Sequence, residues 1–490
     1  MERLFSVPVK ADVMYLRTDA AGGMSSDTYF GAFPCAPYAQ HTTVARLRAC
    51  VRLTGRGRVA LRHLSGDGAA TDVLVAEQAY DADAPATLAL TADLGGYPTG
   101  CLYLAVSADA QTHIEDLWYE GEGEVKPARV AVIICTYRRE ENVRRNLALL
   151  ASALAQDPML ADSLEILCVD NGRTLASAPA PVRLIPNRNF GGSGGYARGM
   201  IEAKGCTHLW LMDDDIGIEP AILRRAVTFL RHRRDDALRL SAGMFAFEAP
   251  TVQHEATARF DGYTFRSNGA GLDFRDRASL LRACVETDEN TYGGWWSMVV
   301  PATGALPMPF FIKLDDVEFG LRQGGPCAVM CGFGVWHEAF GSKGNAWTEY
   351  YTTRNTLIVQ SLYPRLGRSA VKTLGIRLLK ALAYGEPMCM AAALQGVEDY
   401  MAGPEAFGRV DPEARHRSVM QAFGAKLASD MTRSRMLGSA ARNLLKVGNW
   451  RSFGLFFRAL CRLARRRDRR AAWAALADEA FWVRYLGLKA

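Results

Sequence analysis

The sequence lacks long apolar runs, clustered cysteines and internal repeats, and each absence removes a class of protein. No uncharged apolar run reaches the roughly 18 residues that a membrane-spanning helix needs. The best candidate, "ALAYGEPMCMAAALQGV", is interrupted by Glu386 and Pro387. The first residues, "MERLFSVPVKADVMYL", hold no continuous apolar segment and no small-residue cleavage site, so we expect no secretory signal. No repeat of about 20–50 residues is visible, which argues against a solenoid.

An excess of one charge is also missing, since 58 Lys and Arg residues face 52 Asp and Glu residues, a formal net charge of +6. The 11 cysteines are scattered without the spacing of a metal site, so we expect reduced, buried thiols and a cytoplasmic location. Basic residues concentrate only in "RALCRLARRRDRR" (458–470). That segment suits either a solvated helix face or peripheral contact with the cytoplasmic face of the inner membrane.

The pattern of apolar residues divides the chain into three regions. Residues 1–125 hold short alternating runs, such as "VARLRACVRLTG" and "ATLALTADL", between Gly, Asp and Pro, which predicts an N-terminal β-sandwich. In residues 126–355 continuous apolar strands alternate with helical segments, which predicts a parallel α/β sheet covered on both faces. Residues 356–490 carry apolar side chains at spacings of 3 and 4, which predicts a C-terminal helical region.

Polar or acidic residues follow three of the predicted strands. Thr136 and Arg138 come after the first strand and Asp170 after the second, and the stretch "LWLMDDDI" ends a later strand with Asp213, Asp214 and Asp215. In an open α/β sheet, ligands bind outside the carboxyl ends of the strands. We therefore expect these side chains to meet in one crevice.

Asp213 and Asp215 are spaced to share one ligand. In an extended strand, residues i and i+2 point to the same face, so both carboxylates can reach one ion while Asp214 points elsewhere. Crowded carboxylates repel unless a cation neutralises them, and hard oxygen ligands suit Mg²⁺ or Mn²⁺. The residues alone leave a solvated acidic loop or a helix N-terminus as the alternative.

A second acidic pair and two aromatic residues follow. In "FFIKLDDVEFGLR" an apolar run leads into Asp315 and Asp316, which suits either a general base or a helix N-cap. His337 in "GVWHEAFGSKGN" can complete a metal site or have a structural role. Trp295 and Trp296 can border a sugar or belong to the core.

The segment "NRNFGGSGGYARGM" (187–200) fits the dinucleotide pattern G-x-G-x-x-G/A, which keeps an NAD(P)-dependent oxidoreductase as an alternative. The pattern follows a third strand, however, and "PNRN" separates it from that strand, whereas the dinucleotide motif opens a first βαβ unit. We expect the glycines to let the backbone approach a nucleotide or sugar, with Asn189 and Arg198 supplying polar contacts.

Taken in order, "VAVIICTYRRE", "CVDNG", "NRNFGGSGGYARGM", "LWLMDDDI", "GGWWSMVVP", "FFIKLDDVEFGLR" and "VWHEAF" resemble the family-2 GT-A glycosyltransferases. Within that family the motifs are most similar to the polymerising galactofuranosyltransferases of mycobacterial galactan. The resemblance covers about residues 130–355 in motif detail. It implies a Rossmann-like GT-A domain between an N-terminal β-sandwich and C-terminal helices.

The resemblance also implies a function: inverting, metal-dependent transfer of galactofuranose from UDP-galactofuranose to a hydroxyl of a cell-surface glycan or lipid-linked acceptor. The same function implies a part in cell-wall or polysaccharide synthesis, association with the membrane surface and compatibility with a homo-oligomer. The implied site residues are Asp213, Asp215 and His337 for Mn²⁺ or Mg²⁺, Asp316 as the base with Asp315 beside it, Thr136, Arg138, Asp170 and Asn189 for the nucleotide, and Trp295 and Trp296 for the acceptor.

Two further alternatives remain at this point. One is a related transferase that uses another UDP-sugar or a dTDP-sugar, because the residues show a metal-nucleotide-sugar site without naming the sugar. The other is a catalytically inactive carbohydrate-binding scaffold, in which the N-terminal sandwich would contact the glycan.

Overall fold

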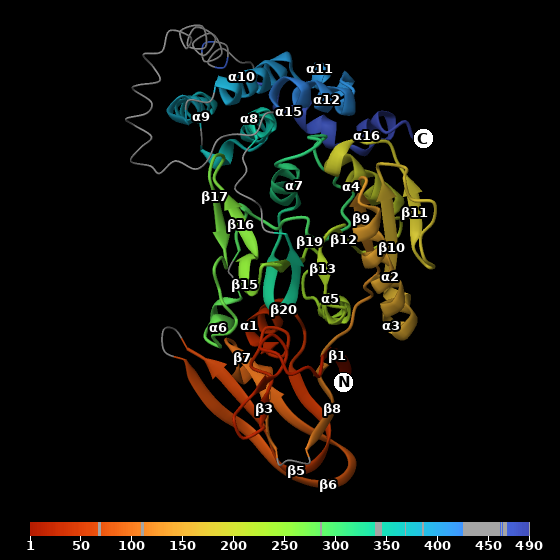
Figure 1. Cartoon of the computed structure of the whole chain (residues 1–490), viewed down its shortest axis with the longest axis vertical. Coiled ribbons are helices and arrows are strands. Elements are labelled where there is room, and N and C mark those ends of the chain that lie inside the picture. The colour runs from red at the N-terminus through yellow and green to blue at the C-terminus, as the bar shows by residue number, and fades with distance from the viewer. Residues whose placement is uncertain are drawn as a thin grey trace.

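A computed structural model describes residues 1–66, 70–108, 112–284, 287–338, 345–367, 369–384, 387–424, 461, 463 and 468–489. Three layers follow one another along the long axis (Figure 1). The N-terminal strands form one end, a sheet with helices on both sides forms the middle, and the C-terminal helices form the other end.

The N-terminal layer is an antiparallel sheet of eight strands. Two long strands, β5 (Arg46–Ser65) and β6 (Thr71–Asp93), pair along their length. The first half of β5 also pairs with β8 and the second half with β7, so one strand joins both parts of the layer. The remaining elements are β1 (Glu2–Val7), β2 (Arg17–Thr18), β3 (Met24–Ser25), β4 (Phe33–Pro34), α1 (Cys35–His41), η1 (Leu94–Gly96), β7 (Cys101–Ala108) and β8 (His113–Glu122).

The predominance of strands expected for residues 1–125 is confirmed, but most of "VARLRACVRLTG" lies in one long strand that continues beyond Gly55. Gly55 has a φ of +96° at a point where the register between β5 and β6 shifts. A bulge at this glycine bends the strand without ending it. Glycine therefore marks a bend here and not a boundary.

The central layer is a nine-stranded sheet in the order β11-β10-β9-β12-β19-β14-β20-β13, with β15 beside β14. The first four strands are parallel, as the sequence predicts. The prediction of a wholly parallel sheet is wrong beyond β12, because β19 runs antiparallel to both of its neighbours. The strands are β9 (Val130–Thr136), β10 (Leu164–Asp170), β11 (Arg183–Pro186), β12 (His208–Asp213), β13 (Gly217–Ile218), β14 (Arg239–Ala246), β15 (Ala249–Glu255), β19 (Ser297–Pro301) and β20 (Cys327–His337).

Helices cover this sheet through apolar stripes. In α2 (Glu140–Gln156) the buried residues Val143, Leu147, Leu150 and Leu154 recur at the helical period and face the core. A small antiparallel sheet flanks the layer. The other elements are α3 (Pro158–Ser163), α4 (Gly191–Glu202), α5 (Ala221–Arg231), β16 (Thr257–Phe260), β17 (Phe265–Asn268), α6 (Ser279–Arg282), β18 (Thr291–Tyr292) and α7 (Asp315–Gln323).

The C-terminal layer holds α8 (Ala346–Leu362), η2 (Pro364–Leu366), α9 (Ala370–Tyr384), α10 (Pro387–Ala402), α11 (Pro404–Arg409), α12 (Pro412–Phe423), α15 (Arg470–Ala474), η4 (Ala475–Ala477) and α16 (Glu479–Tyr485). The expected domain limits at 125 and 355 remain predictions, and α8 continues through the second. Arg465, Arg466 and Arg467 lie outside the described residues. In the part of the chain that is described, no helix combines the length and apolar character needed to span a bilayer.

A buried arginine joins the first two layers. Arg225 on α5 is 1% exposed, donates to the Phe30 carbonyl at 2.8 Å and lies 3.4 Å from the centre of the Phe5 ring. Burial lowers the pKa of its guanidinium, since no carboxylate accompanies it there in the described contacts. On the same helix, the Thr228 hydroxyl donates to the Leu4 carbonyl at 2.6 Å. The N-terminal layer is thus packed onto the central layer through buried polar contacts.

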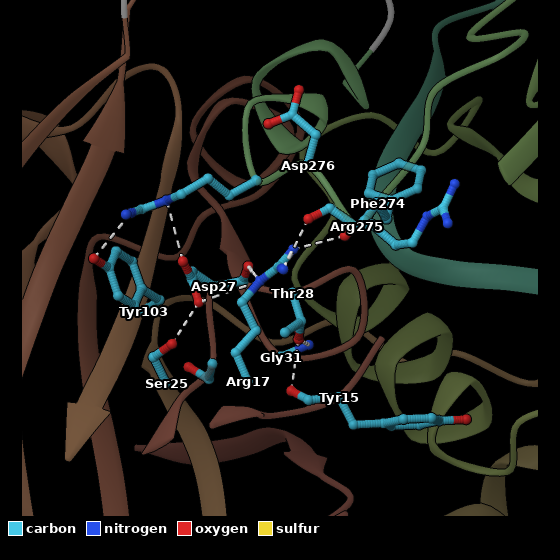
Figure 2. A network of polar contacts seen from close by, with 12 residues as sticks. Tyr15, Arg17, Ser25, Asp27, Thr28, Gly31, Tyr103, Phe274, Arg275 and Asp276 are labelled. Carbon is cyan, nitrogen blue, oxygen red and sulfur yellow. Dashed lines mark hydrogen bonds and ion pairs between the residues drawn. The ribbon is translucent and has the colours of Figure 1, made fainter. Parts of the chain in front are cut away.

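A second polar junction centres on Asp27, which is 4% exposed (Figure 2). Arg277, just before α6, lies 3.1 Å from this carboxylate, and Arg17 lies 3.7 Å from it. Arg17 also donates to the carbonyls of Phe274 and Arg275 at 2.6 and 2.9 Å. Asp27 therefore holds two arginines that connect the N-terminal layer to the segment before α6.

We predict that Asp27→Asn lowers the free energy of unfolding by about 2 kcal/mol, because the buried carboxylate loses the charge that attracts two partly exposed arginines. A urea titration followed by circular dichroism measures the change. The control is Asp93→Asn, which removes an exposed ion pair to Arg46 in the same layer and should cost about 0.5 kcal/mol or less. Equal losses in the two variants would contradict a special role for Asp27.

Candidate functional site

Three parallel strands end at the same edge of the central sheet and deliver polar residues there. Thr136 ends β9, Asp170 ends β10 and Asp213 ends β12. In the strand register Asp170 lies opposite Thr136, and Asp213 lies opposite Cys135. The side chains expected to meet in one crevice therefore do start from one line across the sheet.

Asp213, Asp215 and His337 converge, although they come from two different strand ends. One ligand atom of each lies within 4.8 Å of the other two. His337 Nε2 is 3.3 Å from a carboxylate oxygen of Asp215. Two carboxylate oxygens and an imidazole nitrogen form a donor set that fits Mn²⁺ or Mg²⁺.

Asp214, in the turn directly after β12, points away from this group. It is 4% exposed and accepts hydrogen bonds from the Thr136 hydroxyl at 2.7 Å and from Arg139 at 3.1 Å. The Asn146 amide donates to the Asp214 carbonyl at 3.1 Å. Asp214 therefore fixes the backbone that presents its two neighbours.

The three members of the cluster differ in the direction and cause of their pKa shifts. Burial and the charge of Asp215 raise the pKa of Asp213 to about 6. Burial also acts to raise the pKa of Asp215, but the hydrogen bond from His337 and the charge of Arg139 outweigh it and lower that pKa. Burial acts to lower the pKa of His337, yet the bond to Asp215 raises it to about 9. A bound cation would take the place of the imidazolium proton.

Two residues that sequence reasoning did not single out contact these carboxylates. The Tyr196 hydroxyl on α4 donates to Asp213 at 3.1 Å, and Arg139 forms ion pairs with both Asp214 and Asp215. Arg139 follows the same strand as Arg138, so position after the strand was a usable signal. Arg138, which the sequence analysis assigns to the nucleotide, has a φ of +56° and lies exposed beside the Tyr137 ring.

The second acidic pair begins α7. Burial raises the pKa values of both Asp315 and Asp316, and repulsion from Asp316 adds to the rise at Asp315. A Cβ atom on Gly192 of α4 would lie 3.3 Å from Asp315, so α4 contacts this pair as well as Asp213. After burial itself, the charges of Asp214, Asp213 and Asp315 all raise the pKa of the Cys135 thiol, which lies between the two groups.

The residues expected at the nucleotide have mixed surroundings. Asp170 is 1% exposed, and its carboxylate accepts the backbone N–H groups of Gly172, Thr174 and Leu175. Asn189 accepts the N–H of Gly191 at 3.0 Å where α4 begins. Both shape the loops at the sheet edge, and their contact with a nucleotide stays a prediction.

The two tryptophans differ in their contacts although each is 6% exposed. Trp296 donates its indole N–H to the Ala242 carbonyl at 3.0 Å and packs in the core. Trp295 packs edge-on against Tyr196, with ring centres 4.6 Å apart, and the hydroxyl of Tyr196 contacts Asp213. Trp296 also contacts the acidic cluster through its backbone, because its carbonyl accepts the Asp213 N–H at 3.4 Å.

The glycine-rich segment forms the first turns of α4. A Cβ on Gly191 would lie 2.0 Å from the Phe311 carbonyl, and one on Gly195 would lie 2.1 Å from the Cys135 sulfur. Arg198 pairs with Glu202 on the same helix at 2.9 Å. The expectation that these glycines admit a nucleotide is therefore wrong at these positions, where they admit neighbouring protein. The same contacts count against the oxidoreductase alternative.

Comparison with known proteins finds a matching family and similar proteins that are all described as glycosyltransferases. Residues 131–264 match the family described as Glycosyl transferase family 2. The chain is 31% identical to the galactofuranosyltransferase GlfT2 of Mycolicibacterium smegmatis, over 78% of this chain and 64% of that protein. It is 30% identical to GlfT2 of Mycobacterium tuberculosis, over 80% of this chain and 67% of that protein. The matched region thus spans about two thirds of the length of these relatives.

A solved structure of GalNAc-T7 with UDP, GalNAc and Mn²⁺ is a more distant match. It shares 12% identity and a TM-score of 0.34, and the match covers 50% of this chain and 49% of that one. A likeness at this level carries no argument about the site.

We predict that Asp215→Asn weakens Mn²⁺ binding at least about tenfold, because the negative charge of a ligand is removed. Asp214→Asn is the matched control, since its carboxylate faces Thr136 and Arg139, and Mn²⁺ affinity should fall clearly less than in Asp215→Asn. Calorimetric titration with MnCl₂ measures both. A loss in Asp214→Asn as large as that in Asp215→Asn would show that alternate residues do not hold the ion.

Proposed function

Because this chain belongs to glycosyltransferase family 2, we propose that it is an inverting, metal-dependent transferase that moves galactofuranose from UDP-galactofuranose to an acceptor hydroxyl. One observation carries the proposal. The acidic cluster of Asp213, Asp215 and His337 and the acidic pair Asp315–Asp316 both contact α4, through Tyr196 and Gly192. In this proposal, a diphosphate clamp and a base lie side by side along α4.

In the proposed reaction, Asp213, Asp215 and His337 would hold a divalent cation, whose charge would stabilise the departing UDP diphosphate. Asp316 accepts the proton of the acceptor hydroxyl as that oxygen attacks the anomeric carbon. The bond from the anomeric carbon to the diphosphate oxygen breaks on the opposite side, and the configuration inverts. A raised pKa suits Asp316 to this task, because a stronger base takes the proton more readily.

The nucleotide pocket completes the proposal. Thr136, Arg138, Asp170 and Asn189 would surround the uridine, and Trp295 and Trp296 would border the acceptor side. The donor sugar is supported by the likeness to proteins named galactofuranosyltransferases, and another UDP- or dTDP-sugar is the alternative. An inactive scaffold is disfavoured by the intact acidic cluster.

The acceptor proposed is a cell-surface glycan or a lipid-linked glycan, with roles in cell-wall or polysaccharide synthesis. Peripheral contact with the cytoplasmic face of the inner membrane and a homo-oligomer are part of the same proposal. Two of the arginines that suggest the membrane contact, Arg469 and Arg470, lie at the start of α15.

The deciding experiment titrates the purified protein with UDP, with and without Mn²⁺, and then offers UDP-galactofuranose and UDP-galactopyranose in a turnover assay. We expect UDP binding that requires Mn²⁺ and UDP release from the furanose alone. Binding without that preference would keep the transferase and reject the donor. No UDP binding would reject the nucleotide-sugar site.

We predict that Asp316→Asn lowers kcat by at least about 100-fold, because general-base catalysis contributes on that order or more. UDP and Mn²⁺ affinity should change less than about threefold, since the metal ligands lie on other elements. Loss of Mn²⁺-dependent UDP binding together with transfer would place Asp316 in the metal site.

The pH dependence of kcat/KM should also reflect the role of Asp316 as the base. Asp316 acts when deprotonated, and burial raises its pKa, so kcat/KM should fall with decreasing pH well above the ordinary aspartate value of about 4. Mn²⁺-dependent UDP binding over the same range separates loss of the base from loss of the metal. A rate that stays constant down to pH values near 4 would contradict this role.

A further inference from the structure

The loop that leads into the acidic pair has an unusual backbone. Between β19 and α7, Phe311, Lys313 and Leu314 have φ values of 72°, 69° and 61°. None of them is glycine or asparagine, so each occupies the left-handed region at a cost in free energy. Leu314 immediately precedes Asp315, and its dihedral angles therefore set the direction in which the first turn of α7 leaves the loop. Such a conformation persists only where surrounding contacts enforce it.

Two adjacent residues of α8 supply those contacts from one side. Asn355 is fully buried, and its amide nitrogen donates to the carbonyls of Ile312 and Lys313 at 3.1 and 2.7 Å. Arg354 donates to the Phe310 carbonyl at 2.8 Å. Three carbonyls of the loop thus point at one site on α8.

Arg354 also orients the asparagine. Its Nε donates to the amide oxygen of Asn355 at 2.9 Å, which leaves the amide nitrogen facing the loop. The guanidinium is 5% exposed and donates to the Tyr350 hydroxyl at 3.0 Å, and that hydroxyl donates to Asp399. The asparagine is therefore held in one orientation by a network within the C-terminal helices.

The opposite side of the loop is fixed by α4. The Gly192 N–H donates to the Phe311 carbonyl at 2.9 Å, and the Phe311 N–H donates to the Ser193 hydroxyl at 2.9 Å. These two bonds restrain Phe311, but they do not reach Lys313 or Leu314. Among the described contacts, the carbonyl of Lys313 is held by Asn355.

We propose that Asn355, aligned by Arg354, is a positioning residue that imposes the left-handed path of residues 311–314 and so directs Asp315 and Asp316 toward the acceptor. This inference rests on the proposed function, because it gives the C-terminal helices a part in placing the base. An amide is required at this position, since one group must donate to two carbonyls and accept from an arginine.

The test compares Asn355→Leu with Thr356→Val. Leucine keeps the size of asparagine but makes none of its hydrogen bonds. We expect kcat to fall on the order of 100-fold, because small displacements of a catalytic group have effects of that size. The Kd for UDP in the presence of Mn²⁺ should change less than about threefold, since Asp213, Asp215 and His337 lie on other elements.

Thr356→Val is the matched control. Thr356 is 1% exposed on the same helix, and its hydroxyl has no hydrogen-bond partner among the described residues. Its replacement should leave kcat within about twofold of the wild type. A loss in Thr356→Val equal to that in Asn355→Leu would show that any change in the core of α8 impairs transfer, and would overturn the inference.

A second variant covers a failure of Asn355→Leu to fold. Asn355→Asp keeps the shape and the contact with Arg354 but removes both donors to the loop. It should also lose kcat while retaining UDP binding, and its pH profile for kcat should shift because the acidic pair has moved. Wild-type kcat in this variant, or loss of UDP binding together with transfer, would overturn the inference. Absence of transfer by the wild-type protein with any UDP-sugar would instead reject the proposed function, and the positioning role with it.

Discussion

Repulsion between carboxylates is the constraint around which this molecule is arranged. Asp213, Asp214 and Asp215 end one strand, and the pair Asp315–Asp316 begins a helix that the same α4 contacts. Two unit charges about 4 Å apart repel by about 4 kcal/mol at an effective dielectric constant of about 20. Such an arrangement persists only if each charge has a counterpart or gives up its charge.

The protein meets this constraint differently for each group. Asp214 is neutralised by hydrogen bonds from Thr136 and Arg139 and becomes part of the scaffold. Asp215 retains its charge beside Arg139 and His337, whereas burial raises the pKa of Asp213. Asp315 and Asp316, which have no arginine among their described contacts, have raised pKa values. The described surroundings thus keep the charge of Asp215 and favour protonation of the second pair, and this separation is what the proposed metal site and base require.

Local sequence rules predicted the parts of the site that depend on one strand or one helix. Alternation along β12 was enough to predict that Asp213 and Asp215 share a face and that Asp214 does not. After β9 the sequence did not indicate Arg139, which pairs with Asp214 and Asp215. The glycines of α4 were misinterpreted, since only the structure shows that they contact Phe311 and Cys135. The hydrogen bonds that hold the loop of residues 311–314 come from α8, and no local sequence pattern connects α8 to that loop.

The N-terminal layer is tied to β15 by a continuous series of contacts. Arg17, held by Asp27, donates to the Phe274 carbonyl, and the Phe274 N–H donates to Thr251 on β15. At the end of β15, burial raises the pKa of Glu255, and the charge of Asp316 raises it further. The contacts of Arg17 and Asp27 therefore hold β15 and the segment before α6 against the N-terminal layer. On the other side of the central layer, Asn355 of α8 holds the carbonyls of Ile312 and Lys313, so each outer layer restrains a different segment of the central one.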